Sequence, residues 1–239
     1  MPYYPIFLDL HDKNVLVVGG GKVAERKVQN LLRYGCQINI ISPKLTAHLS
    51  RLAATGSITR IPRDAIDKTM NDAFMVIAAT NDPKVNSTIA AKAKERGLLI
   101  NAVDQPGDCN FIMPSIVKRG DLHIAISTAG KSPALAKKIR KQMELTFGQE
   151  YGAFLELMGL IRTELLAQGA PSSRNRAVFE KLVNSNLLEY IRKKNINDIR
   201  NTLRSILGKG FPIDDILKRI SLTNSLQGSF DTGHQPGRK

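Results

Sequence analysis

A glycine-rich stretch with the sequence VVGGGKVAERK has the residue types and spacing of a phosphate-binding turn. Gly19, Gly21 and Ala24 fit the pattern G-x-G-x-x-A directly after an apolar run and before a helical pattern, and this context makes the short motif specific. The first glycine permits a tight turn, the second lets a pyrophosphate approach the backbone, and the alanine lets the helix pack closely on the sheet. The backbone amides near Lys22 and Val23 would then face the anion at the helix N-terminus. The alternative is a glycine-rich turn that binds nothing, which the surrounding order of strands and helices disfavours.

The end of the next predicted strand leaves the choice of dinucleotide open. Ser42, Pro43 and Lys44 follow that strand, so Ser42 stands where an Asp or Glu normally accepts hydrogen bonds from the adenosine ribose. Ser42 can still bond a ribose hydroxyl, and Lys44 is compatible with a 2′-phosphate. These residues therefore leave the choice between NAD and NADP open.

Small and polar residues follow the predicted fourth strand. Thr80, Asn81 and Asp82 would lie at the carboxyl edge of the sheet, where ligands bind in open α/β folds. We expect Thr80 and Asn81 to contribute to the cofactor site. An equally weighted alternative is that Thr80 and Asp82 only cap the following helix.

The periodicity of apolar residues predicts an α/β fold with an N-terminal Rossmann-like parallel sheet. Strand patterns alternate with amphipathic helical patterns, an order that implies a parallel sheet covered on both faces. A small α+β segment follows, in which two short strands turn at Arg119-Gly120-Asp121 and Ser132 caps a helix that begins at Pro133. The apolar strand segments are residues 15–19, 37–42, 73–80 and 98–104, and further helices are predicted near 151–168, 174–183, 186–194, 197–208 and 212–220.

Composition narrows the class of protein. The chain of 239 residues carries 35 Lys and Arg against 21 Asp and Glu, and a net charge of +14 favours a polyanionic partner. No apolar segment is long enough to span a bilayer and no signal peptide is visible, so we expect a cytoplasmic protein without membrane association. The two cysteines show neither metal-ligand spacing nor a neighbouring His cluster, and no metal site is predicted. Low aromatic content, 5% with no Trp, disfavours nucleic-acid binding.

Four segments of the chain form a distinctive combination: PIFLDL, VLVVGGGKVAERK, IAATNDPKVN and the long segment NAVDQPGDCNFIMPSIVKRGDLHIAISTAGKSPALAKKIR. Together they resemble the siroheme synthase family of precorrin-2 dehydrogenases and bifunctional dehydrogenase/ferrochelatases. The most specific part is FIMPS followed by IAIS-x-x-G-x-SP, which an ordinary dinucleotide-binding protein has no reason to carry. The resemblance is close up to about residue 145 and loose beyond it.

The resemblance implies NAD-dependent oxidation of precorrin-2, a tetrapyrrole, to sirohydrochlorin, with iron insertion to make siroheme in some members. Fe²⁺ would then be a substrate. It also implies a homodimer, and the chain looks like the stand-alone form without a fused methyltransferase domain. The expected division is an NAD-binding domain, a dimerisation segment, a helical domain and a disordered tail, at residues 1–112, 113–147, 148–222 and 223–239.

The same resemblance implies that Asp104 is the general base, because the family has its base at the matching aspartate. A carboxylate beside the macrocycle suits the loss of a proton during oxidation and the loss of pyrrole protons during iron insertion. Without the resemblance, Asp104 is better explained as a turn residue that ends the fifth strand. Asp108, four residues further on, is a weaker candidate.

Substrate-binding candidates lie in and after the segment IAISTAG. Precorrin-2 carries acetate and propionate carboxylates, which a basic cleft would attract. We expect Ser127 and Thr128 to line that cleft, with Lys131 and Lys137 among the cations that neutralise the carboxylates. Relatives often have Ser in place of Thr128, which leaves its finer role open. His123 is more simply explained as a structural histidine than as a residue that handles metal.

Two other classes of function share some of these features. A regulatory NAD-sensing domain would have the same glycine turn but would need no acid or base at the cofactor edge. A basic nucleic-acid-binding protein is less consistent with the composition. Hydride transfer with precorrin-2 separates the enzyme from both, whereas salt-sensitive, sequence-dependent DNA binding would favour the second.

Overall fold

The computed structural model describes residues 3–169 and 171–222, and the chain forms two compact units. The first unit comprises the residues up to Met113 together with Ala129–Lys131, and the second comprises Pro114–Thr128 and the chain from Ser132 onward. The tail predicted at 223–239 lies outside the described residues.

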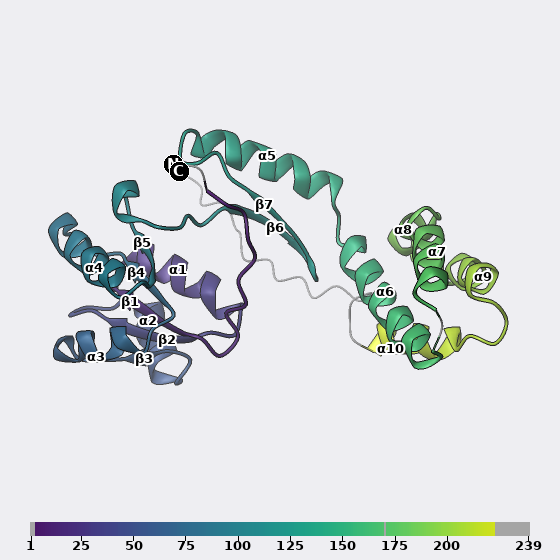
Figure 1. The fold of residues 1–239 in the computed structure, drawn as a ribbon, viewed down its shortest axis with the longest axis horizontal. Helices are drawn as coiled ribbons and strands as arrows, with labels where there is room; N and C mark the ends of the chain where they lie inside the picture. Colours follow the sequence, from purple (N-terminus) through teal and green to yellow (C-terminus); the bar gives the residue numbers. More distant parts are fainter. Residues whose placement is uncertain (1–2, 170, 223–239) are drawn as a thin grey trace. The chain divides into compact units, whose positions relative to one another are not determined.

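A five-stranded parallel sheet forms the centre of the first unit, with the strand order β3-β2-β1-β4-β5 (Figure 1). The predicted Rossmann-like sheet is therefore confirmed. Val18 pairs with Ile41 on one side and with Ala78 on the other, so the carboxyl ends of three strands are level. The strands are β1 (Asn14–Val18), β2 (Gln37–Ile41), β3 (Thr59–Arg60), β4 (Met75–Ala78) and β5 (Leu99–Ala102).

Helices cover both faces of this sheet because side chains alternate between the two faces along each strand. Val15 and Val17 of β1 belong to the core beneath the first two helices, whereas Leu16 and Val18 belong to the core beneath the next two. Burying one such aliphatic side chain stabilises the fold by roughly 1.5–3 kcal/mol. The helices are α1 (Lys22–Leu32) and α2 (Ala47–Ala54) on one face and α3 (Ile66–Asn71) and α4 (Pro83–Glu95) on the other.

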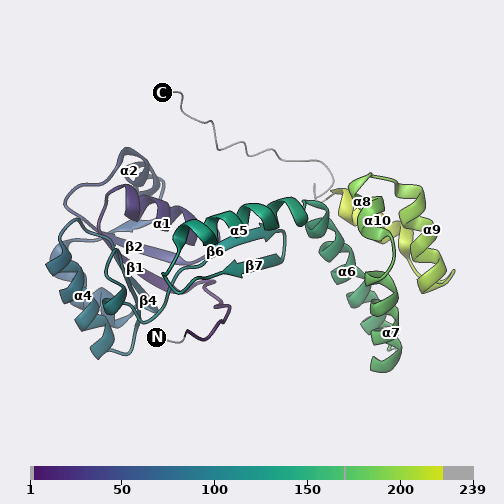
Figure 2. The same ribbon diagram turned by 90° about the horizontal axis from the view of Figure 1, so that it is seen from above.

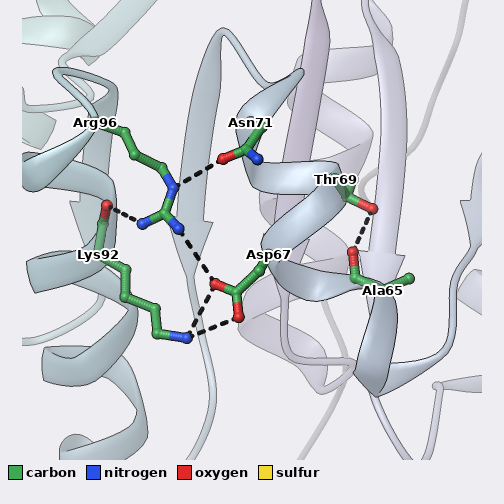
Figure 3. A network of polar contacts seen from close by, with 6 residues as sticks. All are labelled: Ala65, Asp67, Thr69, Asn71, Lys92 and Arg96. Carbon is green, nitrogen blue, oxygen red and sulfur yellow. Dashed lines mark hydrogen bonds and ion pairs between the residues drawn. The ribbon is translucent and has the colours of Figure 1, made fainter.

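Polar contacts join α3 to α4 at the surface (Figure 3). Lys92 Nζ lies 3.0 Å from both carboxylate oxygens of Asp67, and Arg96 Nε donates to Asn71 Oδ1 at 3.0 Å. Asp67 is about half exposed, at 53%, and exposed ion pairs contribute only about 0–1 kcal/mol. These contacts orient the two helices, whereas the apolar core between helices and sheet supplies most of the stability.

The free edge of β5 is covered by the chain that follows it. The side chain of Asn110 accepts a hydrogen bond from the backbone of Ile100 at 2.8 Å and donates one to the carbonyl of Leu98 at 2.8 Å. Its backbone N–H also donates to Ile100 O at 3.1 Å. Asn110 therefore occupies the place of a neighbouring strand and satisfies backbone groups that an edge strand otherwise exposes.

The strands depart most from the sequence prediction at three places. The third strand, β3, has two exposed residues and pairs only with β2, which is too short for a periodic pattern. The fifth strand ends at Ala102, so Asp104 lies in the turn beyond it. The segment FIMPSIVKRG, residues 111–120, predicts one strand, but β6 begins only at Ser115, because the residues before it cover the edge of β5.

An antiparallel hairpin and a long helix begin the second unit. The strands β6 (Ser115–Arg119) and β7 (Leu122–Ile126) pair with Val117 opposite Ile124, as predicted. Helix α5 (Pro133–Thr146) lies along the hairpin in both views (Figure 2). Ser132 Oγ accepts a hydrogen bond from the Leu135 N–H, which confirms the predicted cap.

Helices with a shared apolar core complete the second unit. Phe154, Leu157 and Ile161 of α6 pack with Leu182 of α7 and Leu203 of α9. The elements, close to the predicted helices, are α6 (Glu150–Ala167), α7 (Ser172–Val183), α8 (Leu187–Arg192), α9 (Ile196–Leu207) and α10 (Ile213–Leu222). Within the described parts of both units, no helix has the length and apolar character to cross a membrane.

Two glycines let the hairpin turn contact the start of α6. Gly120 has φ 56°, and a Cβ placed on it would lie 3.0 Å from Gly152 Cα. A Cβ on Gly152 would lie 3.2 Å from the backbone of Arg119. Arg119 closes the same junction, because its Nε donates to Phe147 O at 2.8 Å and its Nη2 donates to Glu144 O at 3.1 Å. The guanidinium thus satisfies carbonyls at the end of α5.

We expect Gly152→Val to destabilise the second unit by roughly 1–3 kcal/mol, because the added side chain overpacks the backbone of the hairpin turn. Gly159→Ala on the same helix is the matched control, since a Cβ there meets nothing within 4 Å. It should stabilise the helix by about 0.5–1 kcal/mol. Thermal unfolding followed by circular dichroism measures both changes. Equal melting temperatures for the two variants would contradict the close contact.

Candidate functional site

The glycine turn lies where β1 and β4 meet at the carboxyl edge of the sheet. Gly19 has φ 125°, and a Cβ on it would lie 2.2 Å from the carbonyl oxygen of Ala79, so only glycine fits there. Gly21 precedes α1 with φ −84°, and a Cβ on it would meet nothing within 4 Å. Ala24 is fully buried against the sheet. The turn therefore combines a tight bend with open space above the helix N-terminus, which is the arrangement that a dinucleotide pyrophosphate requires.

Gly20, which lies between the two glycines of the motif, holds the loop after β2 against this turn. A Cβ on Gly20 would lie 2.2 Å from Lys44 O and 2.6 Å from Ser42 Oγ. The Thr46 N–H donates to Gly20 O at 3.0 Å, and the Thr46 hydroxyl donates to the Glu25 carboxylate on α1. The β2–α2 loop is thus fixed to the turn by contacts that require glycine at position 20. The pattern G-x-G-x-x-A does not specify a residue at this position, so it did not indicate these contacts.

The predicted ribose-binding residues lie in that loop. Ser42 Oγ donates to the carbonyl oxygen of Lys44 at 2.7 Å. Arg60 of β3 reaches the same loop, where its Nη2 donates to Ser42 O at 3.0 Å and to Pro43 O at 2.9 Å. The side chains of Lys44 and Arg60 are exposed. Sequence reasoning missed Arg60, because a two-residue strand gives no periodic signal.

Thr80 and Asp82 form a capping network after β4. The Thr80 N–H donates to Asn86 Oδ1 at 3.0 Å, and the Thr80 hydroxyl lies 2.7 Å from the same oxygen. Asp82 caps α4 by accepting from Lys84 N at 2.8 Å. Asn86 is 3% exposed and fixes this turn from inside the domain. The capping interpretation is thus supported for Asp82, whereas Asn81 is exposed beside the network.

Asp104 presents a free carboxylate beyond β5. Its backbone has φ 58°, in the left-handed region that Asp tolerates better than most residues. The side chain is exposed, and within residues 3–169 and 171–222 its carboxylate forms no hydrogen bond or ion pair. A carboxylate in this state can accept a proton from a ligand without losing a structural contact.

Asp108, the weaker candidate for the base, is held by its surroundings. Its Oδ2 accepts a hydrogen bond from Ser87 Oγ at 2.7 Å, and Gln105 Nε2 donates to the same hydroxyl at 2.9 Å. Gln105 also donates to Pro83 O at 3.1 Å, which ties the loop to α4. These contacts favour a structural role for Asp108 and leave Asp104 as the available carboxylate of the pair.

Lys27 of α1 connects the helix to β5 and to the segment that follows. Its Nζ donates to Asn101 Oδ1 at 2.8 Å and to Met113 Sδ at 3.4 Å. Burial lowers the pKa of the Lys27 ammonium and the charge of Arg26 lowers it further, whereas the negative charge of Asp104 acts in the opposite direction. Lys27 therefore places a partly desolvated positive charge within electrostatic range of Asp104.

The predicted substrate-binding residues lie on both units. Ser127 and Thr128 follow β7 in the second unit, where Thr128 Oγ1 accepts a hydrogen bond from the Ser132 N–H at 3.2 Å. Lys131 belongs to the first unit, and Lys137 projects from α5 in the second. The ammonium side chains of Lys131 and Lys137 are exposed. Lys138 and Lys141, two further lysines of α5, are exposed as well.

The two cysteines and His123 lie wholly or partly inside the fold. Cys36 and Cys109 are buried free thiols, and Cys109 Sγ accepts a hydrogen bond from the Ala102 N–H at 3.2 Å. His123 lies in β7 with a partly buried side chain. Among the described residues, no group of three or more His, Cys, Asp or Glu is placed to hold a metal ion.

Family comparisons match both parts of the predicted pattern. Residues 6–115 match the family model described as "Putative NAD(P)-binding", and residues 119–144 match the one described as "Sirohaem biosynthesis protein central". The first match covers the parallel sheet and the glycine turn, and the second covers most of the hairpin and α5. The first unit accordingly contains a domain for a nicotinamide dinucleotide.

Curated relatives carry the name siroheme synthase. The chain is 38% identical over 188 residues to siroheme synthase 3 of Aeromonas hydrophila. The aligned region is 79% of this chain and 40% of that protein. It is 32% identical over 231 residues to the siroheme synthase of Thioalkalivibrio sulfidiphilus, 97% of this chain and 47% of that protein. The chain thus spans less than half the length of these relatives.

A solved structure, SirC, precorrin-2 dehydrogenase, has a fold similar to that of this chain. The TM-score is 0.72 at 26% sequence identity, and the match covers 85% of this chain and 98% of the solved chain. The fold, both family models and the sequence relatives agree with the motifs from which the resemblance was drawn. The chain is thus similar to siroheme synthases in sequence and to SirC in fold.

Proposed function

We propose that this protein is a precorrin-2 dehydrogenase that forms sirohydrochlorin with a nicotinamide dinucleotide as hydride acceptor. The observation that carries the proposal is the free carboxylate of Asp104 in a domain whose glycine turn leaves open space at Gly21. SirC, the structural neighbour that shares this fold over nearly its whole length, is a precorrin-2 dehydrogenase. An NAD-sensing domain would need the turn but not the carboxylate.

The residues of the first unit divide the chemistry between them. Amides at the start of α1 would hold the pyrophosphate, and the loop containing Ser42 and Lys44 would hold the adenosine ribose. The bound dinucleotide would supply the hydride acceptor. Oxidation of precorrin-2 also releases a proton, and Asp104 accepts it as general base. The hydride and the proton together are the two hydrogens that sirohydrochlorin lacks.

Basic and hydroxyl side chains would bind the carboxylates of the substrate. Ser127 and Thr128 offer hydroxyls, and the exposed ammonium groups of Lys131 and Lys137 offer positive charge. The charge distribution supports this role, because residues 1–112 hold 14 basic and 10 acidic residues whereas residues 113–239 hold 21 and 11. Charge-assisted hydrogen bonds to several carboxylates would orient the macrocycle as well as attract it.

An incubation of the purified protein with precorrin-2 and each nicotinamide dinucleotide tests the proposal. We expect reduced cofactor and sirohydrochlorin to appear together in the absorption spectrum, in equal amounts. Binding of the dinucleotide without turnover of precorrin-2 would favour the NAD-sensing alternative. Absence of dinucleotide binding together with salt-sensitive binding of DNA would favour the nucleic-acid alternative.

Iron insertion is the second activity in the proposal, with Fe²⁺ as a substrate, and it rests on the similarity to siroheme synthases. Metal insertion displaces pyrrole protons, and the same Asp104 carboxylate would accept them. Incubation of the protein with sirohydrochlorin and Fe²⁺ or Co²⁺ gives a separate spectral readout. Metal insertion no faster than in the protein-free control would restrict the function to dehydrogenation.

The proposal includes a homodimer formed through residues 113–147. In each chain this segment joins a cofactor domain at 1–112 to a helical domain at 148–222. Leu135 and Leu145 of α5 support it, because these large apolar side chains are 48% and 86% exposed in the single chain. We expect a dimer mass by light scattering at micromolar concentration. Leu145→Lys should shift the mass toward the monomer, whereas Leu166→Lys on α6, also exposed at 62%, should not. A monomer mass for the unaltered protein would contradict the dimer.

A further inference from the structure

We infer that the loop after β2, together with Arg60, forms a binding site for the 2′-phosphate of NADP. The inference rests on the proposed nicotinamide cofactor and adds a preference between its two forms. It predicts that the protein binds NADP(H) at least as tightly as NAD(H). Arg60 is then a specificity-determining residue.

The position of the loop follows from contacts on both of its sides. The Gly19 N–H donates to Ile41 O at 2.8 Å, and the Thr46 N–H donates to Gly20 O at 3.0 Å. Residues 42–45 are therefore held beside the phosphate turn, at the carboxyl end of β2. In dinucleotide-binding domains, this is where the 2′-position of the adenosine ribose lies.

The charge at this position is the reverse of that in an NAD-selective site. An Asp or Glu at the end of the second strand accepts hydrogen bonds from the ribose hydroxyls and repels a 2′-phosphate. Here Ser42 replaces the acid, and Lys44 adds a positive charge two residues on. Glu25, an acidic side chain in the first turn of α1, is engaged by the Thr46 hydroxyl.

Arg60 brings a second cation to the same loop in a fixed orientation. Register pairing places Arg60 beside Ile40, one residue before the end of β2. Its Nη2 donates to Ser42 O at 3.0 Å and to Pro43 O at 2.9 Å, which anchors one edge of the planar guanidinium. Within the described ranges, its Nε and Nη1 make no hydrogen bond, and the side chain is exposed. Three N–H donors of an anchored guanidinium are thus available for a phosphate.

Direct binding tests the site without turnover. Titration with NADPH and NADH, followed by the fluorescence of the reduced nicotinamide, gives the two dissociation constants for the unaltered protein. Competition against NADPH by 2′,5′-ADP and by 5′-ADP isolates the 2′-phosphate from the nicotinamide. We expect 2′,5′-ADP to compete at least about tenfold better, because charge-assisted hydrogen bonds are the stronger class.

Arg60→Gln is the diagnostic variant, and Arg33→Gln is its matched control. Arg33 is exposed at the other end of α1, so the control removes the same charge far from the glycine turn. Arg60→Gln should weaken NADPH binding about 10- to 100-fold and change NADH binding less than about threefold. The control should change neither, and increasing salt should weaken NADPH binding more than NADH binding.

Each other outcome has a distinct meaning. Weaker binding of NADPH than of NADH by the unaltered protein would overturn the phosphate site and leave the proposed function intact. An equal loss of both dinucleotides in Arg60→Gln would show that Arg60 only supports the loop, and would also overturn the inference. If neither dinucleotide bound the unaltered protein, the cofactor assignment itself would fail and the phosphate site with it.

Discussion

Asp104→Asn should lower the rate of precorrin-2 oxidation by at least about a hundredfold, the usual minimum contribution of general-base catalysis. Affinity for the dinucleotide should stay within about twofold of the original, because Asp104 lies beyond β5 and outside the glycine turn. Asparagine is the informative replacement, since it tolerates the left-handed backbone found there, whereas alanine would add backbone strain. Single-turnover kinetics and a fluorescence titration measure the two quantities.

Asp108→Asn is the matched control for this prediction. It removes the other carboxylate of the same loop, and its amide oxygen can still accept the hydrogen bond from Ser87. We expect turnover within about threefold of the unaltered enzyme. The assignment of the base would move to the loop if Asp108→Asn lost activity and Asp104→Asn kept it.

Gly21→Asp should abolish dinucleotide binding, with a loss of at least about a hundredfold in affinity. The carboxylate would occupy the anion position at the start of α1, where it would both fill the open space and repel the pyrophosphate. The fold should survive, because Gly21 has φ −84° and a Cβ there meets no atom within 4 Å. Titration with NADH and NADPH measures the affinity, and circular dichroism verifies the fold.

Two neighbouring variants separate binding from folding in this turn. Gly21→Ala adds only a methyl group and should fold normally while weakening the dinucleotide. Gly19→Ala should instead destabilise the first unit, because its Cβ would lie 2.2 Å from Ala79 O at φ 125°. Unchanged affinity in a folded Gly21→Asp protein would refute the cofactor site.

The sheet and the turn were predictable because their signals are local. Buried strands such as β1 and β4 are continuous apolar runs, and the glycine spacing between strand and helix is typical of a dinucleotide-binding turn. The cap at Ser132 was predictable for the same reason, since a capping side chain and the amide that it binds lie within one turn of helix.

Contacts between distant segments were not predictable from periodicity. Arg60 belongs to the cofactor loop through hydrogen bonds to residues 42 and 43, and nothing near it in the sequence indicates this. The same holds for Lys27 of α1, which donates a hydrogen bond to Asn101 of β5. The hydrogen bond that holds Asp108 was not predictable either, because its partner Ser87 lies on another element.

The contact between Gly120 and Gly152 limits how this part of the protein can evolve. Gly120 is restricted by its φ of 56° and also by space, because a Cβ on it would lie 3.0 Å from Gly152 Cα. Gly152 is restricted by space alone. A side chain at position 152 therefore becomes acceptable only after the hairpin turn has moved away, and not before. The order of substitutions matters, so a residue that a relative accepts at position 152 can be harmful in this chain.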